Sequence, residues 1–519
     1  MPKELEITID SILGGIAPSL GYAGEGQYLA GIGIDLEFPN SDSAALIKPS
    51  GWARPTAMEK FSGATMDQTP LWILTNPKST NIYVYGAGGD LYSYDSDLDN
   101  EALVSAIATS GGNGAAYYDN YLYLARNTDV ASYGPLNGSP AIDVDAWTTS
   151  PLGSQTALTD TTYPSINGVE MPNHVMHRHT DDALYFCDVH SGGYGILNKI
   201  KTTKTTVEGD TNDGSTYNAL DFDFGLYPTT IETYQTSLAI ALIEGLNTTI
   251  RQKNAKLSFW DTTSDSFSFI TEDEFPDPLI TALLNVNGIL YVASGSASGG
   301  CRISQYVGGY THKTIWYNQD AYPPFQGAFK HLLDRVVFGS KTTYPEVSAS
   351  VFAIGSMDGR LSNGVHNIIR ATALGNNPMV TAIAYVQNSA FPKLAPIVGW
   401  KHDSSQGIDK LSTTYGVALI RFGAFKIGER FEIYQIDIPL GAAITTNMFI
   451  TPTILVDSET SSTVCRAIHP TNFIASDKKA QIFTRVIGET DFILELRWTG
   501  TVLLPVAFPI KIKLRTIHG

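Results

Sequence analysis

The segment HVMHRHTDDALYFCDVH, residues 174–190, carries the densest group of side chains that could bind a metal ion. His174, His177 and His179 lie within six residues, and in an extended strand His177 and His179 point to the same face. Imidazole nitrogens combined with carboxylates are ligands for zinc and other transition metals. The spacing matches no standard zinc pattern, however, and a hairpin turn explains the Asp181-Asp182 pair. We therefore assign no metal here and keep the three histidines only as candidates.

A second candidate for cation binding is DSDLDNE, in which Asp95, Asp97 and Asp99 occupy alternate positions. Calcium loops place oxygen ligands at these intervals, followed by a glycine and, at the twelfth position, a bidentate glutamate. Here Asn100 replaces the glycine and Ala106 occupies the twelfth position. A solvated loop explains this segment better than a calcium site does, and we predict no cofactor for the protein.

Motifs that commonly mark a catalytic centre are absent from the sequence. It has no G-x-S-x-G, no P-loop, no G-x-G-x-x-G strand–helix unit and no H-E-x-x-H. We therefore predict no catalytic residue and no enzymatic activity. Glycoside hydrolysis is the activity that the sequence leaves open, because a pair of carboxylates has no spacing signature.

The composition indicates an ordered, turn-rich β protein. The 519 residues include 47 glycines and 26 prolines, aromatic residues make up 11%, and charged residues make up only 16%. A disordered chain has fewer aromatics and more charge. The acidic N-terminal residues lack the basic start and apolar stretch of a secretory signal, and no apolar run is long enough to span a bilayer. The three cysteines lie far apart, so we expect free thiols.

The charge is unevenly distributed along the chain. The net charge is −17, and residues 408–519 contain 12 Lys and Arg against 10 Asp and Glu, a net of +2. Residues 1–407 therefore hold 22 basic and 41 acidic residues, a net of −19. Such an acidic body disfavours tight binding to nucleic acid, whose affinity comes mainly from Lys and Arg contacts to phosphates. Transient passage of DNA past this surface remains compatible with it.

One short pattern recurs and determines the predicted fold. In LLNVNGILYVASG, residues 283–295, two apolar runs flank Asn287-Gly288, a pair that adopts the φ > 0 conformations of tight hairpin turns. Similar hairpins have return strands that begin near residues 82, 121, 183, 238, 289, 336 and 395. Units of about 40 to 60 residues with about four short strands are typical of propeller blades. We therefore predict an all-β protein with a β-propeller of about seven blades.

Three regions follow from this pattern. We predict an N-terminal strand-containing segment over 1–63, a β-propeller over 64–405 and a C-terminal antiparallel β-sandwich or jelly roll over 406–519. Within the first region, Gly26–Phe38 is strand-rich, so it could close the propeller by joining the last blade or contact neighbouring proteins. Longer strands after residue 410, of which the clearest is Ile510–Arg515 with alternating apolar and basic residues, indicate the sandwich.

An acidic propeller followed by a β-sandwich, without a signal peptide or a catalytic motif, resembles the virion proteins of tailed bacteriophages, in particular the tail nozzle class. The features that carry the resemblance are the hairpins between Asn76 and Trp400 and the strands between Tyr415 and Arg515. It is a resemblance of architecture, and it transfers no functional residue.

The resemblance implies a structural component of the phage tail, a nozzle or tail-ring protein. Such a protein is made in the host cytoplasm, forms a cyclic homo-oligomer, binds other virion proteins and has no membrane span. The alternative that we carry forward is a propeller that binds or cleaves carbohydrate as a receptor-binding protein.

Overall fold

A computed structural model describes most of the strands of the chain. The described residues are 3–10, 30–32, 58–60, 67–75, 81–94, 101–106, 111–147, 158, 161–190, 192–201, 216–246, 254–263, 271–308, 311–319, 321–332, 335–341, 350–356, 361–364, 379–386, 395–402, 405–411, 418–440, 449–457, 459, 461–473, 479–499, 506 and 508–517. Within them almost all regular structure is β-strand, and the helical element is a short 3-10 turn, η1 (Gln326–Ala328). The predicted all-β class is therefore confirmed.

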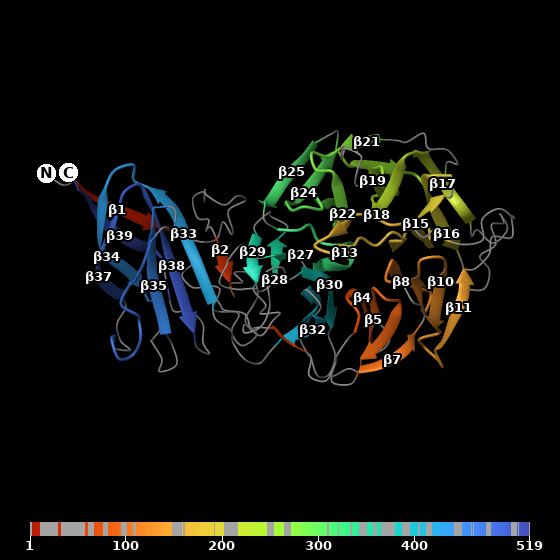
Figure 1. The fold of residues 1–519 in the computed structure, drawn as a ribbon, viewed down its shortest axis with the longest axis horizontal. Coiled ribbons are helices and arrows are strands. Elements are labelled where there is room, and N and C mark those ends of the chain that lie inside the picture. The colour runs from red at the N-terminus through yellow and green to blue at the C-terminus, as the bar shows by residue number, and fades with distance from the viewer. Residues whose placement is uncertain are drawn as a thin grey trace. The chain divides into compact units, whose positions relative to one another are not determined.

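Seven four-stranded antiparallel sheets make up the largest part of the described structure (Figure 1). They are β4 (Pro70–Thr75), β5 (Ile82–Gly86), β6 (Asp90–Tyr94) and β7 (Glu101–Ala106); β8 (Gly114–Tyr118), β9 (Tyr121–Ala125), β10 (Val130–Gly134) and β11 (Ala141–Trp147); β14 (Met176–Arg178), β15 (Ala183–His190), β16 (Tyr194–Lys201) and β17 (Thr216–Phe224); β18 (Leu226–Tyr234), β19 (Ser237–Glu244), β20 (Lys256–Trp260) and β21 (Thr271–Glu274); β22 (Leu279–Val286), β23 (Ile289–Gly295), β24 (Cys301–Gly308) and β25 (Thr311–Asn318); β26 (Phe329–Leu332), β27 (Arg335–Lys341), β28 (Ser350–Ser356) and β29 (Leu361–Gly364); and β30 (Met379–Val386), β31 (Ala395–His402), β32 (Ser405–Leu411) and β3 (Met58–Lys60). A two-stranded hairpin, β12 (Ser165–Ile166) and β13 (Val169–Glu170), lies between the second and third sheets in the sequence.

The first strands of these sheets form a closed ring. Strands β4, β8, β14, β18, β22, β26 and β30 each contact the next one, and β30 contacts β4. Sheets that surround a common axis with their first strands innermost are the blades of a β-propeller. The chain therefore contains a β-propeller, as the hairpin series predicts, and its return strands are the second strands of the blades.

Turn chemistry explains why the hairpins form where they do. Asn287 and Gly288 have φ values of 50° and 84°, and Asp119 and Asn120 have φ values of 46° and 67°. Two consecutive residues with positive φ make the turn whose twist matches the flanking strands. The hairpin between β14 and β15 has Asp181 and Asp182 in its turn, as predicted. His179 N–H donates to the Ala183 carbonyl, so the turn has three residues, and of these Asp182 takes a positive φ.

A threonine on the innermost strand links neighbouring blades. The Thr229 hydroxyl on β18 donates to the Ile280 carbonyl on β22 at 2.7 Å, and the Thr381 hydroxyl on β30 donates to the Pro70 carbonyl on β4. Both threonines lie where the strand register shifts by one residue, at a β-bulge. The bulge brings the hydroxyl within reach of the next blade, and the Thr229 hydroxyl also lies 3.4 Å from the Ala241 carbonyl of its own blade.

We expect that Thr229→Val will lower the free energy of unfolding by about 1 to 2 kcal/mol, because it leaves a buried carbonyl without its donor at nearly constant volume. Chemical denaturation followed by circular dichroism measures the change. Thr229→Ser keeps the hydroxyl and is the control. Equal stability of the Val variant and the unmodified chain would contradict an inter-blade role for this hydrogen bond.

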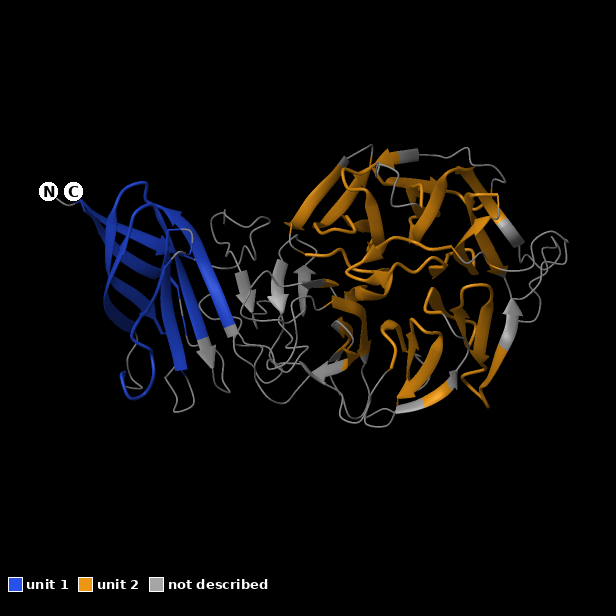
Figure 2. Cartoon of the chain, viewed as in Figure 1, with its two compact units in different colours: residues 1–59, 351–368, 411–519 blue, residues 60–350, 369–410 orange. Residues whose placement is uncertain are grey.

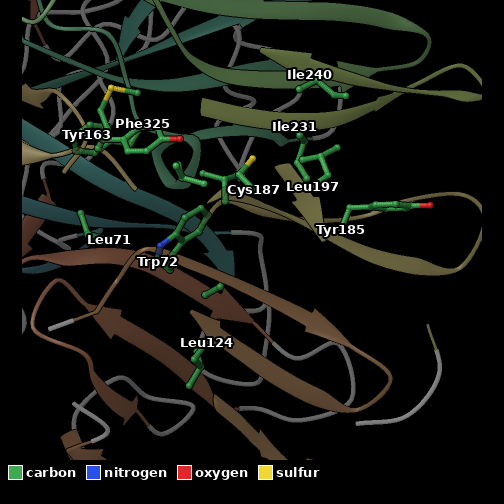
Figure 3. Packing of buried hydrophobic residues seen from close by; sticks show 14 of the residues in the cluster. Leu71, Trp72, Leu124, Tyr163, Tyr185, Cys187, Leu197, Ile231, Ile240 and Phe325 are labelled. Carbon is green, nitrogen blue, oxygen red and sulfur yellow. The ribbon is translucent and has the colours of Figure 1, made fainter. Parts of the chain in front are cut away.

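Apolar side chains from neighbouring blades pack together around the ring. Figure 3 shows Trp72 and Leu124 from the first two blades near Cys187 and Leu197 of the third and Ile231 of the fourth. All five side chains are almost completely buried. The second strand of each blade supplies much of this core, which explains why it is the most hydrophobic part of each repeat.

The structure divides into two compact units (Figure 2). Unit 1 comprises residues 1–59, 351–368 and 411–519, and unit 2 comprises residues 60–350 and 369–410. The boundaries expected from the sequence lie after residues 63 and 405.

Unit 1 contains two further antiparallel sheets. One is β1 (Glu4–Ile9), β39 (Ile510–Thr516), β34 (Phe431–Pro439) and β37 (Lys479–Gly488), and the other is β2 (Ala30–Ile32), β33 (Ala418–Lys426), β38 (Asp491–Thr499), β35 (Phe449–Val456) and β36 (Ser461–Val464), each written in spatial order. Ile436 and Ile512 from the first sheet and Leu494 from the second belong to one buried core. Strand β1 pairs along its full length with β39, so the propeller strands are inserted between parts of unit 1 in the sequence.

The predicted 1–63 region does supply the strand that completes the last blade, but that strand is β3 and not part of Gly26–Phe38. The described strand of Gly26–Phe38, β2, pairs with β33 in unit 1. A three-residue strand carries too little sequence information to specify which open sheet edge it completes, so the pattern alone could not choose between these partners.

Candidate functional site

One position recurs on the innermost strand of every blade. In six blades this position lies two residues before the last paired residue of the first strand, in the hairpin that joins the first and second strands. On β4 the position is identified from the β-bulge, because Leu74 follows the bulge residue Leu71 by three residues, as Glu232 follows Thr229 on β18. We call these residues the axial layer: Leu74, Ala116, His177, Glu232, Leu284, Lys330 and Ala384. Except for Ala384 they are partly exposed, although neighbours on the same strands such as Ile231 and Leu283 are fully buried. Partial exposure on an innermost strand is expected for side chains that face the central channel of a propeller.

Three members of the axial layer are ionisable, and they come from three blades. His177 is on β14, Glu232 is on β18 and Lys330 is on β26. The Nε2 atom of His177 lies 3.4 Å from Oε1 of Glu232. Lys330 is near enough to influence the charge of both groups. The structure therefore brings together a carboxyl, an imidazole and an amine that are far apart in the sequence.

Hydrogen bonds to Thr233 determine the tautomer of His177. The backbone N–H of Thr233 donates to Nε2 of His177 at 3.1 Å, so Nε2 carries no proton. The Thr233 hydroxyl lies 2.8 Å from the same nitrogen and 3.0 Å from Nδ1 of His179. A neutral imidazole has one N–H, which must then be on Nδ1. Nδ1 of His177 is consequently a donor, and it makes no hydrogen bond within the part of the chain that the structure describes.

Burial controls the protonation of this cluster. It raises the pKa of Glu232 to about 8, although the Thr233 backbone N–H and Lys330 both oppose the shift. Burial also lowers the pKa of His177 to about 3, helped by repulsion from His179 and Lys330. The pKa of Lys330 is lowered by burial, against the attraction of Glu232. Near neutral pH the cluster therefore contains a largely protonated Glu232, an uncharged His177 and the amine of Lys330.

This arrangement presents hydrogen-bond donors rather than acceptors. Glu232 Oε1 already accepts the Thr233 backbone N–H at 3.0 Å, which leaves Oε2 for its proton. Within the described part of the chain, Lys330 makes no hydrogen bond or ion pair of its own. A protonated carboxyl, an imidazole N–H and an amine can bind an electron-rich group or transfer a proton to one.

The structure separates His174 from the other two candidate histidines. His174 is fully buried, with Nδ1 at 3.0 Å from the Cys187 carbonyl and 3.6 Å from Asp188 Oδ1, and Nε2 near the Asn127 carbonyl. His177 and His179 share the hydroxyl of Thr233. Across the described residues, no three His, Cys, Asp or Glu side chains group in a way that could hold a metal ion. Asp95, Asp97 and Asp99 lie outside the described residues.

The sequence reasoning found His177 but missed Glu232 and Lys330. A signal for both was present, because each occupies the same hairpin position as His177 in its own repeat. Aligning the six repeats other than the first by their hairpins would have shown three ionisable residues at a position that is otherwise Leu or Ala. The sequence alone provides no reason to compare this position between repeats, because only the fold shows that it faces the axis.

The fold and this layer define the chain as a β-propeller with an ionisable cluster on its axis. The chain matches no protein-family model. It also matches no curated protein sequence. Solved structures resemble it at low sequence identity.

The computationally designed Ika8 protein is 10% identical, with 69% of this chain and 100% of that chain covered at a TM-score of 0.38. The extracellular domain of the hybrid two-component system BT4673 from B. thetaiotaomicron is 13% identical, with 76% and 45% covered at a TM-score of 0.41. An oligogalacturonate lyase in complex with manganese is 9% identical, with 70% and 98% covered at a TM-score of 0.38. Separately, no helix in the described residues has the length and apolar character needed to cross a membrane.

Proposed function

We propose that the chain is a structural subunit of a multi-copy particle, namely a tail component of a bacteriophage virion, and that unit 1 is its docking module. We further propose that the two sheets of unit 1 form a β-sandwich, which their shared apolar core supports. The observation that carries the docking assignment is a surface on the sheet of β1, β39, β34 and β37.

Basic side chains cover two carboxylates on this surface. Both carboxylates are on β34, and each is flanked by one cation from β37 and one from β39: Asp437 by Lys479 at 2.8 Å and Lys513 at 3.6 Å, and Glu432 by Arg485 at 3.1 Å and Arg515 at 2.7 Å. Although burial raises the pKa of Asp437, hydrogen bonds from Lys479 and Gln435 hold it below its usual value. The four cations therefore lie outermost over Asp437 and Glu432, and the basic side chains are concentrated on β37 and β39, whereas Glu4 and Glu6 on β1 lie opposite Arg515 and Lys513.

Two large apolar side chains lie on the same surface. Phe483 is 72% exposed and Ile487 is 39% exposed, and both alternate along β37 with the buried residues Ile482 and Val486. We call Phe483, Ile487 and the four cations the docking face. An exposed apolar patch with a charged rim is typical of a protein–protein contact.

Charge complementarity indicates a second copy of the chain as the occupant. Residues 1–407, which include Glu4 and Glu6 of β1 but consist mostly of the propeller strands, have a net charge of −19, and the cations of β37 and β39 are attracted to such an acidic surface. A contact between different surfaces of identical subunits is heterologous. Such contacts close into a ring when the rotation that relates neighbouring subunits is a whole fraction of a full turn. A cyclic assembly of this kind is what a tail component requires.

We expect that Phe483→Asp will abolish self-association, because it places a carboxylate in the centre of the docking face. Mass photometry at about 50 mM and about 500 mM NaCl should show oligomers of the unmodified chain that weaken with salt. Phe224→Asp is the matched control, since Phe224 is 83% exposed on β17 of the propeller. Oligomers that persist in Phe483→Asp would contradict the docking face, and absence of the chain from purified virions would contradict the virion assignment.

The axial layer supports the alternative that the propeller binds or cleaves carbohydrate. The protonated Glu232 could donate a hydrogen bond or a proton to a sugar oxygen. Cleavage also needs a second carboxylate as nucleophile or base, and Glu232 is the one carboxyl among the seven residues of the layer, so the layer supports carbohydrate binding more than cleavage. Release of reducing sugar from host polysaccharide, lost in Glu232→Gln, would favour this function over the structural one.

A further inference from the structure

We propose that the axial layer is a binding site for a small carboxylate with a hydrocarbon body. This inference concerns the propeller alone and does not depend on assembly through the docking face.

The donors of the layer lie on one arc of the ring. In ring order the layer reads Leu74, Ala116, His177, Glu232, Leu284, Lys330 and Ala384. The blades of His177, Glu232 and Lys330 are the third, fourth and sixth, so the polar groups are on one side of the axis. Nδ1–H of His177, the proton of Glu232 and the amine of Lys330 are three donors, and a carboxylate accepts hydrogen bonds through both oxygens.

The remaining arc is apolar. The seventh, first and second blades supply Ala384, Leu74 and Ala116, and none of these side chains can form a hydrogen bond. Two of the three are alanines, which leave more room near the axis than the larger residues of the opposite arc. A ligand with an anionic head and an aliphatic body can bind the donors through its head and pack its body against the apolar arc. Phosphate has no apolar part that could pack against the apolar arc.

Charge also favours an anion over a cation or a neutral ligand. The titratable side chains around Glu232 are His177 on β14, His179 in the turn that follows it and Lys330 on β26, while β22 and β30 present Leu284 and Ala384 at this level. With Glu232 protonated and both histidines neutral, no anion among these groups offsets the burial that lowers the pKa of Lys330, so a bound anion would favour its charged form. A bound carboxylate neutralises that charge and supplies the ion pair that Lys330 lacks within the described residues.

The test uses the full chain and isothermal titration with sodium butyrate, and with butyramide and inorganic phosphate for comparison. At about pH 6.5, where Glu232 is protonated, we expect saturable binding of butyrate and at least tenfold weaker binding of both comparison compounds. Lys330→Met should weaken butyrate binding at least tenfold. Lys313→Met, which changes an exposed lysine on β25, should leave it unchanged. Circular dichroism establishes that each variant is folded.

The second arm concerns Glu232. Its ionisation should weaken butyrate binding about fourfold between about pH 6.5 and about pH 8.5, given a pKa of about 8. Glu232→Gln keeps a donor at this position, so it should retain most of the affinity at pH 6.5 and show a smaller loss at the higher pH. Absence of butyrate binding, equal binding of butyramide or phosphate, or unchanged affinity in Lys330→Met would each overturn the proposal.

Discussion

Gly114→Ala is expected to destabilise the propeller by roughly 3 to 5 kcal/mol, which is enough to unfold many domains. Gly114 is the first residue of β8, and a Cβ atom built there would lie 1.8 Å from the carbonyl oxygen of His174. Both atoms of this clash belong to backbone or are rigidly attached to it, so no side-chain rotation relieves it. The second and third blades would have to move apart, and the backbone hydrogen bond from His174 N–H to the Asn113 carbonyl would be strained or lost.

Denaturant unfolding followed by far-UV circular dichroism measures this effect. Gly138→Ala is the matched control, because a Cβ atom there meets nothing closer than 3.6 Å and the residue is not in the left-handed region. The control should change the free energy of unfolding by less than about 0.5 kcal/mol. A Gly114→Ala variant as stable as this control would show that the two blades are not packed as described.

Glu232→Gln is expected to stabilise the protein above about pH 8 and to have little effect near pH 5. The folded carboxyl has a pKa of about 8, above the 4.5 of an ordinary glutamate, so the folded state holds a proton between these values that the unfolded state has released. Stability of the unmodified chain therefore falls as pH rises through this window, by up to about 1.4 kcal/mol per pH unit. Glutamine has no such proton, and its stability lacks this pH dependence.

The expected gain of Glu232→Gln at about pH 8.5 is roughly 2 to 4 kcal/mol. The whole interval between the two pKa values would correspond to a larger gain in the free energy of unfolding. The gain is reduced because the Glu232 side chain keeps 13% exposure and because the ionised carboxylate is attracted to Lys330. Unfolding curves of both proteins at about pH 5 and about pH 8.5 provide the comparison. Parallel changes of stability with pH would refute a protonated Glu232 in the axial layer.

Local turn chemistry made the propeller predictable. The return strands expected near residues 82, 121, 183, 238, 289, 336 and 395 begin at Ile82, Tyr121, Ala183, Ser237, Ile289, Arg335 and Ala395. They were found because a hairpin depends on residues that are adjacent in the chain, such as Asn287 and Gly288. Their number and spacing then indicated blades, because a single hairpin cannot bury its apolar face alone.

Pairing between distant segments was not predictable in the same way. Strand β1 pairs with β39 across the whole length of the chain, and β2 joins unit 1 rather than a blade. Strands β1 and β2 have no short turn that connects them to their partners, so the register depends on which sheet edge is open after folding. The sequence contains no local signal for that edge.

The sequence by itself determined the strands, the turns and the repeated hairpin position that includes His177, Glu232 and Lys330. Only the tertiary structure decided that these residues share one layer, because closure of the ring brings β14, β18 and β26 around one axis. It also decided their chemistry. A carboxyl and an imidazole in a sequence have ordinary pKa values, and burial within the ring raises the pKa of Glu232 and lowers that of His177. Desolvation depends on how many protein atoms surround a group, and that number is a property of the folded chain.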